Sequence, residues 1–223
     1  MRENIPISER ILYEDNHLII VHKLAGEIVQ EDKTGDEPLS EKVRVFLKEK
    51  YKKSGNVFVG IIHRIDRPVS GVVIFAKTSK GLLRMNELFK LREIRKFYHV
   101  LVEQKPTVLE QTLEHFLRKN EKLNRSVVSN ERKEGYLTAV LHYKYLYSTV
   151  NYHLLEVELF TGRHHQIRAQ LAANGTCIKG DLKYGAKRSN PDGSISLQAQ
   201  KVVFKHPIAK KNIEIETPFG LRN

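Results

Sequence analysis

Residues 57–78 read V-F-V-G-I-I-H-R-I-D-R-P-V-S-G-V-V-I-F-A-K-T. The two apolar, β-branched runs in this stretch, Val57–Ile62 and Val72–Ala76, each have the length and composition of a buried strand. The charged connection between them contains proline, serine and glycine, which favour a turn. The pattern therefore predicts two strands joined by a short rigid loop that carries a single carboxylate, Asp66.

Asp66 has arginines close by in the sequence, Arg64 before it and Arg67 after it. Nearby guanidinium groups favour the charged form of a carboxyl group, so we expect Asp66 to be ionised. An ionised and oriented aspartate can serve as a nucleophile, a general base or a metal ligand. A salt bridge that only fixes the turn explains the same residues equally well, so this loop alone leaves its function open.

The composition indicates a folded chain with a polyanionic partner. The chain has 223 residues, of which 40% are hydrophobic, enough for a sizeable core. Lys and Arg outnumber Asp and Glu by 38 to 26, which gives a net charge of +12 and favours nucleic acid as the partner. The only cysteine is Cys177, which excludes an intramolecular disulfide and a cysteine-rich zinc site.

The sequence also gives expectations for location and domain organisation. The N-terminus lacks the apolar region of a signal peptide, and no stretch approaches the length of a membrane span. We therefore expect a cytoplasmic protein without a membrane partner. Because no repeat, low-complexity tract or linker interrupts the chain, residues 1–223 are predicted to form a single domain.

Local patterns predict the elements of the N-terminal half. Residues 9–22 have the pattern of a β-hairpin, and residues 39–50 that of an amphipathic surface helix after a polar loop. Ser79 is a candidate N-cap of a second helix, whose apolar stripe includes Leu82, Met85 and Phe89 and should pack behind the sheet.

The C-terminal half is predicted to be mainly β. Residues 136–160 and 197–219 have strand patterns, with His206 in a loop. His164, Ile167, Arg168 and Leu171 instead recur at helical spacing, with Gly175 where the helix should stop. The adjacent histidines 164 and 165 point in different directions on a helix and lack a carboxylate cluster, so we predict no metal site there.

Three motifs resemble those of the RluA-type pseudouridine synthases. His63–Gly71 is similar to the catalytic motif H-R-L-D-x-x-T-S-G, which an apolar run follows in this family. Lys96 and Tyr98 are in register with the second motif, K-x-Y-x-A-x-V. Thr161–Arg168 resembles the third, T-G-R-T-H-Q-I-R. Each motif alone could have a purely structural explanation. Such separate explanations do not predict that all three motifs occur in the order found in the family.

Two further segments are similar to family patterns. His22–Gly26 resembles the N-K-P-A-G turn, and Ile178–Gly185 resembles P-I-x-G-D-x-x-Y-G, which we interpret as scaffolding. The chain departs from the usual residues at Leu24, Ile65, Val69, His164 and Cys177.

The resemblance implies an α+β fold: a bent, mixed, mainly antiparallel β-sheet with flanking helices and loops, and a catalytic cleft across the sheet. It implies an isomerase that converts uridine in ribosomal or transfer RNA to pseudouridine after flipping the base out of the RNA. The chain would be a catalytic domain without the small N-terminal RNA-binding domain of many relatives. No cofactor is implied, and we expect a monomer.

The resemblance also assigns roles to residues. Asp66 would be the catalytic nucleophile, Tyr98 would lie against the target uracil, and Arg168 would orient Asp66 through a salt bridge. Arg64 would fill the place of the flipped base. The remaining candidates for contact with RNA are His63, Arg67, Lys96, Arg163, His165 and Ile167.

Residues 103–135 support two interpretations. Leu109, Leu113, Phe116 and Leu117 fall at helical spacing, whereas the family is usually extended here. We favour strand and loop. The segment is locally basic and is the best candidate for adapting to a particular RNA.

Two other functions remain open. A catalytically silent RNA-binding protein of the same fold would not need Asp66. A nuclease that uses Asp66 and His63 would need a divalent metal ion and would cut the strand.

Overall fold

The computed structural model describes residues 5–218, 220 and 221. The chain divides into two compact units. Of the described residues, the first contains those up to Ile94 and those from Ala199 to Gly220, and the second contains Arg95–Gln198 and Leu221. Because each unit has its own sheet region and core, the two are described separately, and a single domain over 1–223 stays a prediction.

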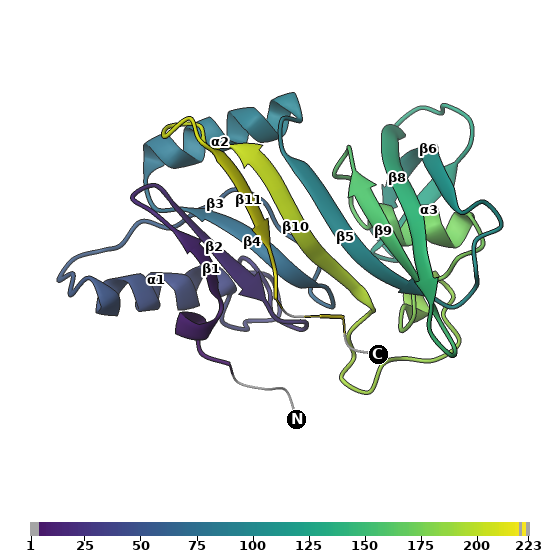
Figure 1. Ribbon diagram of the computed structural model, residues 1–223, viewed down its shortest axis with the longest axis horizontal. Helices are drawn as coiled ribbons and strands as arrows, with labels where there is room; N and C mark the ends of the chain where they lie inside the picture. The colour runs from purple at the N-terminus through teal and green to yellow at the C-terminus, as the bar shows by residue number, and fades with distance from the viewer. Residues whose placement is uncertain (1–4, 219, 222–223) are drawn as a thin grey trace. The chain divides into compact units, whose positions relative to one another are not determined.

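The architecture is α+β, as predicted, with antiparallel strand pairs and three α-helices among the described residues (Figure 1). In the first unit the strand order is β1-β2-β4-β10, with β11 paired to β10 and β3 paired to β4. The elements are η1 (Ile7–Glu9), β1 (Ile11–Glu14), β2 (Leu18–Lys23), α1 (Leu39–Lys50), β3 (Gly60–Ile61), β4 (Ser70–Ala76), α2 (Ser79–Leu91), β10 (Leu197–Lys205) and β11 (Asn212–Glu216).

The strands β2 and β4 are buried on both faces, which explains why most of their residues are apolar. On one face, alternate residues such as Ile19 and Phe75 pack with Leu39 and Val43 of α1. The residues between them pack on the other face around Met85 of α2. Alternate residues of these strands therefore contribute to two separate hydrophobic cores. Packing on both faces holds β4 in place, and β4 in turn supports the Asp66 loop that precedes it.

Most predictions for this unit are confirmed. β1 and β2 form the predicted hairpin, and its turn is fixed because Oδ1 of Asp15 accepts the backbone N–H groups of His17 and Leu18 at 2.7 and 2.8 Å. The prediction for α2 was wrong by one residue: Thr78 is the N-cap, since its Oγ1 accepts the N–H of Gly81 at 3.0 Å.

The prediction of a long strand over 57–62 was wrong, because only β3 (Gly60–Ile61) pairs with β4. The reason is the topology of β4. β2 pairs with one edge of β4 along its length, from Leu18 opposite Ala76 to Lys23 opposite Gly71. β10 is the neighbour of β4 on the other edge. β3 therefore pairs with β4 only at Phe75 and Ala76, near the end of that strand.

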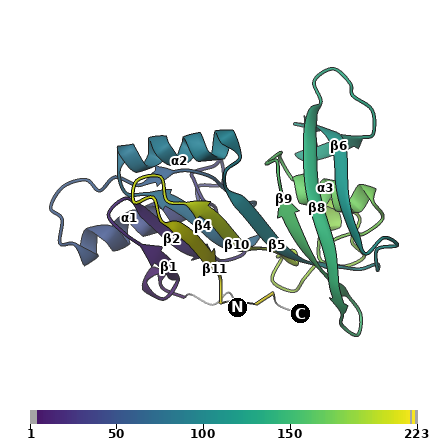
Figure 2. The same ribbon diagram turned by 45° about the horizontal axis from the view of Figure 1, so that its top comes forward.

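The second unit has the strand order β5-β9-β8-β6-β7. Its elements are β5 (Arg95–Val102), β6 (Glu110–Asn120), β7 (Arg125–Ser129), β8 (Leu137–Ser148), β9 (His153–Leu159), α3 (Gln166–Ala173) and η2 (Leu182–Tyr184). The two views show β6, β8 and β9 side by side with α3 against them (Figure 2). Buried Gln170 of α3 joins helix to sheet, because its Nε2 donates to the carbonyl groups of Leu113 and Ala139.

The favoured interpretation of residues 103–135 is confirmed, since β6 and β7 form a hairpin there. The helical spacing was ambiguous because a separation of four residues is also two periods of a strand. Leu113 and Leu117 indeed lie on one buried face of β6. The predicted helix stop is also confirmed: α3 ends before Gly175, which has a φ of +77°.

The strands predicted over 136–160 and 197–219 are present as β8 to β11, and His206 lies in a loop as expected. Phe219 lies outside the described residues. None of the helices in the described part of the chain is long and apolar enough to cross a bilayer.

Candidate functional site

The loop that carries Asp66 is fixed through its backbone. The N–H of Val69 donates to the Asp66 carbonyl at 3.0 Å and closes a tight turn. The carbonyl of Arg67 accepts the Gly26 N–H at 2.7 Å and Nζ of Lys23 at 3.1 Å. The end of β2 and the turn after it therefore hold the peptide that follows Arg67, and the half-buried side chain of Asp66 starts from a fixed backbone.

Lys23 is the residue of this site that the sequence analysis missed. Its side chain is fully buried, and Nζ donates to the carbonyls of Leu24, Glu27 and Arg67 at 3.0, 2.8 and 3.1 Å. Burial lowers the pKa of Lys23 to about 7, while the carboxylates of Glu27 and Asp66 raise it. The only signal in the sequence was the similarity of His22–Gly26 to the family turn.

The two arginines near Asp66 do not clamp it. Arg64 is exposed and forms no ion pair with a described residue. The guanidinium of Arg67 instead binds the loop before α1, with Nη1 2.6 Å from Oδ2 of Asp36 and Nη2 2.6 Å from Oγ1 of Thr34. A salt bridge from either arginine to Asp66 is therefore not formed, because Arg64 is exposed and Arg67 has partners in the loop before α1.

His63 supports the second half of β4. Its Nε2 accepts the backbone N–H of Ile74 at 3.0 Å, and its ring stacks on that of Phe89 of α2 with centroids 5.1 Å apart. The predicted contact of His63 with RNA stays a prediction.

Gly71 is required where β4 begins. Its φ is +121°, and a Cβ there would lie 2.2 Å from the carbonyl oxygen of Ala199 in β10. No side chain fits at that distance. The glycine thus lets β10 approach β4 next to the Asp66 loop.

In the second unit, β5 carries two of the predicted residues on one face. Lys96 and Tyr98 are two residues apart; Tyr98 is buried and lies opposite Val157, whereas Lys96 is half-buried. The other face begins with Phe97, whose ring lies under the Arg95 guanidinium at 4.8 Å.

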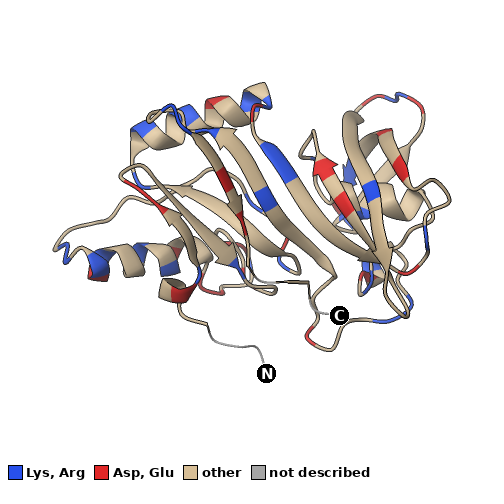
Figure 3. Ribbon diagram, in the orientation of Figure 1, with Lys and Arg blue, Asp and Glu red and all other residues tan. Residues whose placement is uncertain are grey.

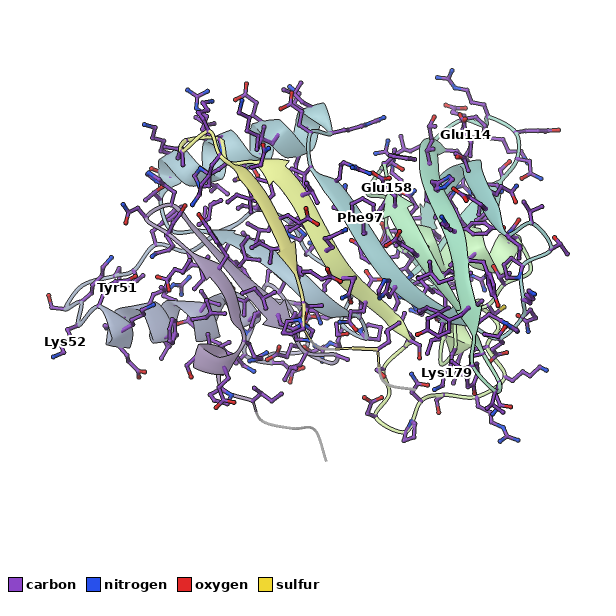
Figure 4. The ribbon with its side chains drawn as sticks, viewed as in Figure 1. Tyr51, Lys52, Phe97, Glu114, Glu158 and Lys179 are labelled. Carbon is purple, nitrogen blue, oxygen red and sulfur yellow. The ribbon has the colours of Figure 1, made fainter. Side chains whose placement is uncertain are left out.

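Arg95 also binds the carboxylate of Glu158 on β9, with Nε 2.7 Å from Oε1. Figure 4 shows Phe97 and Glu158 in neighbouring strands. This ion pair fixes the register at the start of β5, where the predicted RNA-facing residues Lys96 and Tyr98 follow.

Arg168 forms a buried ion pair with Asp181. Nε and Nη2 of the arginine lie 2.7 and 2.8 Å from the two carboxylate oxygens, and the side chains are only 6% and 1% exposed. The guanidinium also lies 5.2 Å from the centroid of the Tyr184 ring. Arg168 therefore has a fixed orientation, which a group that positions another carboxylate needs. Its salt bridge with Asp66, a residue of the other unit, stays a prediction.

Asp181 belongs to the G-D-x-x-Y-G segment that we interpreted as scaffolding, and it fills that role directly. Tyr184 of the same segment accepts the Ser126 N–H at 2.7 Å and hydrogen bonds to Nδ1 of His165 at 3.1 Å. The segment thus joins β7 to the start of α3.

His165 is neutral. Burial, followed by the charges of Arg168, His164 and two lysines, lowers its pKa to about 2. Its backbone is left-handed, with φ +51°, and its ring stacks on His164 with centroids 3.8 Å apart. Any contact of His165 with RNA would therefore be a hydrogen bond of a neutral imidazole and not an ion pair.

The other predicted residues of this motif differ in accessibility. Ile167 is 5% exposed, so its side chain belongs to the interior of the unit. Arg163 is half-buried, and its Nε donates to the Thr138 carbonyl at 3.0 Å. Gln166 makes four hydrogen bonds that connect the loop, β8 and α3, which explains why the motif needs an amide there.

Positive charge occurs in both units. Lys and Arg lie along α1 and α2, at the start of β5 and in β6 and β7 (Figure 3). Within the described part of the chain, no group of three or more His, Cys, Asp and Glu side chains could hold a metal ion. The expectation that the side chains of His164 and His165 point in different directions on a helix was wrong, because His165 is the left-handed N-cap of α3 and the two rings stack.

Comparison with known proteins gives a consistent family. Residues 17–173 match the model of a family described as RNA pseudouridylate synthase. The chain is 29% identical over 225 residues to ribosomal large subunit pseudouridine synthase C of Buchnera aphidicola, covering 97% of this chain and 69% of that protein. It is 31% identical over 215 residues to the uncharacterized RNA pseudouridine synthase YhcT of Bacillus subtilis, covering 94% and 68%.

Solved structures show the same fold. The chain superposes on human RNA pseudouridylate synthase domain containing 4 with a TM-score of 0.80, covering 96% of this chain and 89% of that one at 20% identity. For human RNA pseudouridylate synthase domain containing 1 the TM-score is 0.72, with 94% and 83% covered, also at 20% identity. At this identity the similarity concerns the fold alone, and it confirms the predicted fold class.

Proposed function

Because this chain belongs to the RNA pseudouridylate synthase family, a family of isomerases, we propose that it converts a uridine of RNA to pseudouridine with Asp66 as the catalytic nucleophile. The observation that supports Asp66 most is the construction of its loop. The carbonyl of Asp66 accepts a hydrogen bond from Val69, and that of Arg67 accepts hydrogen bonds from Lys23 and Gly26, so the backbone is fixed at the aspartate and directly after it. A purely structural loop salt bridge would not explain this support, since neither Arg64 nor Arg67 pairs with Asp66.

The reaction exchanges one bond to the ribose for another. The bond from uracil N1 to ribose C1′ breaks, the uracil rotates, and C5 bonds to C1′. The proton of C5 leaves, and N1 gains one, so no oxidant, reductant or group carrier is consumed. Asp66 would assist the cleavage of the first bond as a nucleophile.

The target uridine must leave the stack first, at a cost of a few kcal/mol. Arg64 suits the role of filling the vacated stack, because it is exposed and has no ion-pair partner among the described residues. Tyr98 would offer a ring face to the uracil and a hydroxyl for proton transfer. Arg168, oriented by Asp181, would hold the Asp66 carboxylate.

The substrate to test first is large-subunit ribosomal RNA, because relatives of this chain are named for it. The net charge of +12 supports binding dominated by phosphate contacts. We expect binding to weaken steeply as salt rises, and a flat response would contradict this mode of recognition. Transfer RNA is the second substrate class.

The experiment measures release of tritium from ribosomal RNA labelled at uracil C5. The wild-type protein should release tritium without added metal, and Asp66→Asn should lose release while RNA binding survives. Glu134→Gln is the control, because this residue is exposed and outside the site. Retained release in Asp66→Asn would remove Asp66 from its role. Binding without release by the wild-type protein on both RNA classes would favour the catalytically silent RNA-binding protein.

A further inference from the structure

An acidic loop lies beside the candidate nucleophile. Residues 30–38 contain four carboxylates and one lysine, in a chain whose net charge is +12. All side chains from Glu31 to Glu37 are exposed, and the segment has neither helix nor strand. Its C-terminal end is held where α1 begins, by hydrogen bonds from Leu39 N–H to Ile28 and from Ser40 N–H to Val29.

Arg67 provides the other attachment of this loop. Its Nη1 lies 2.6 Å from Oδ2 of Asp36, and its Nη2 lies 2.6 Å from Oγ1 of Thr34 and 3.5 Å from Oδ2 of Asp32. Thr34 hydrogen bonds to both carboxylates and so orients them toward the guanidinium. The two carboxylates raise the pKa of Arg67, and the arginine together with Thr34 lowers theirs.

Arg67 is placed where an RNA phosphate should arrive. It follows Asp66 directly, and its own carbonyl is fixed by Lys23 and Gly26. The guanidinium therefore extends from a rigid point next to the residue that would act on the flipped nucleotide. Guanidinium binds phosphate and carboxylate with the same fork geometry, so either group can occupy this arginine.

We propose that the guanidinium of Arg67 is a binding site for a backbone phosphate of the substrate RNA, and that Asp32 and Asp36 occupy this site until RNA displaces them. The acidic loop is then an internal competitor of the substrate. This inference rests on the proposed function, because it takes RNA to be the ligand.

The exposure of the three groups makes displacement possible. The side chains of Arg67, Asp32 and Asp36 are 35, 42 and 58% exposed. Exposed ion pairs are weak and are screened by salt, so the bound carboxylates can be replaced by a phosphate that arrives with further contacts. The displaced Asp32 and Asp36 stay charged near the RNA backbone, so the acidic loop opposes RNA binding.

The alternative explanation is that Asp32 and Asp36 only order the loop. In that case their removal should weaken RNA binding or leave it unchanged, because the loop loses its attachment. The inference predicts the opposite sign, so the direction of the change in affinity separates the two.

The test measures dissociation constants for a fluorescein-labelled oligouridine and for transcribed large-subunit ribosomal RNA, at several salt concentrations. The variants are Asp32→Asn/Asp36→Asn and the matched control Glu31→Gln/Glu37→Gln. The control changes the charge of the same loop equally, but its exposed residues form no ion pair with a described residue. Both double variants are also made together with Arg67→Ala, and the same dissociation constants are measured. Thermal unfolding verifies that each variant is folded.

We expect Asp32→Asn/Asp36→Asn to bind both RNAs about three- to ten-fold more tightly than the control pair, the range that loss of exposed ion pairs allows. Because the bound RNA contacts Arg67 in both pairs, their log–log slopes of affinity against salt should differ by less than the value of about 0.7 that one single-strand phosphate contact contributes. In the Arg67→Ala background the two pairs should bind alike.

Three results would overturn the inference. These are equal affinities of the two pairs with Arg67 present, weaker binding by Asp32→Asn/Asp36→Asn, and an advantage that persists without Arg67. The assay needs no turnover, so it separates this inference from the proposed function. If the protein is not an isomerase, tritium release is absent while the affinity difference remains. If only the inference fails, release persists without that difference.

Discussion

The buried lysine behind the Asp66 loop gives a testable dependence of stability on pH. Lys23 is 0% exposed, and burial lowers its pKa from 10.5 to about 7. The unfolded chain therefore binds a proton between pH 7 and 10.5 that the folded protein does not hold. Stability must rise with pH in this window, because the unfolded state binds more protons there.

The magnitude follows from the size of the shift. One pKa unit corresponds to 1.36 kcal/mol, so the full window is worth about 5 kcal/mol. Between pH 7 and pH 9 the expected gain in the free energy of unfolding is about 2 kcal/mol, since the group is only half titrated at pH 7. Below pH 7 the contribution of Lys23 levels off.

The assay compares urea unfolding of the wild-type protein with that of Lys23→Met at pH 6, 7, 8 and 9. Subtracting the variant removes the contribution of the other titrating groups. From pH 7 to pH 9 the free energy of unfolding of the wild type should rise by about 2 kcal/mol relative to that of Lys23→Met. Below pH 7 the difference between the two proteins should stay nearly constant. Lys80→Met, a change at an exposed residue of α2, is the control and should give a constant difference throughout.

Parallel curves for the wild type and Lys23→Met over the whole range would refute the reasoning. They would mean that Lys23 has the same proton affinity in both states and that its three carbonyl partners fully replace water. A second arm uses Asp66→Asn. Because the Asp66 carboxylate raises the pKa of Lys23, this variant should move the start of the rise to lower pH.

Three further substitutions test the supports of the site. Gly71→Ala should lower the free energy of unfolding by about 3–5 kcal/mol, because the new Cβ meets backbone and φ is +121°; Gly193→Ala, with positive φ but open space, should cost less. Asp181→Asn should cost about 3–5 kcal/mol by leaving the charge of Arg168 buried without its partner, and a loss below about 1 kcal/mol in urea unfolding would contradict this. Thr78→Ala should cost about 1 kcal/mol by removing the cap of α2, whereas Thr78→Ser should restore most of it in thermal unfolding.

Local sequence was sufficient for elements whose stability is decided by their own pattern. The apolar runs of β2 and β4, the amphipathic α1 and the turn at Asp15 each carry their signal within a few residues. The pattern was insufficient where one spacing fits two structures. Leu113 and Leu117 fit a helix or a strand, and only pairing with β8 decided for the strand.

The family resemblance located Asp66, Tyr98 and Arg168, but it did not show what surrounds them. Arg67 was expected beside Asp66 because the two are neighbours in the chain. Its partners are instead Asp32 and Asp36, which are more than thirty residues away. Adjacent side chains on a turn can point apart, so sequence distance says little about which charges meet.

The sequence by itself determined that this protein has an α+β fold, belongs to one enzyme family and carries a lone aspartate in a rigid loop. Only the tertiary structure decided that Lys23 is buried under that loop and that Arg168 is held by Asp181. The physical reason is that strand and helix patterns arise from neighbours along the chain. Burial and ion pairing depend on groups that folding brings together from distant positions.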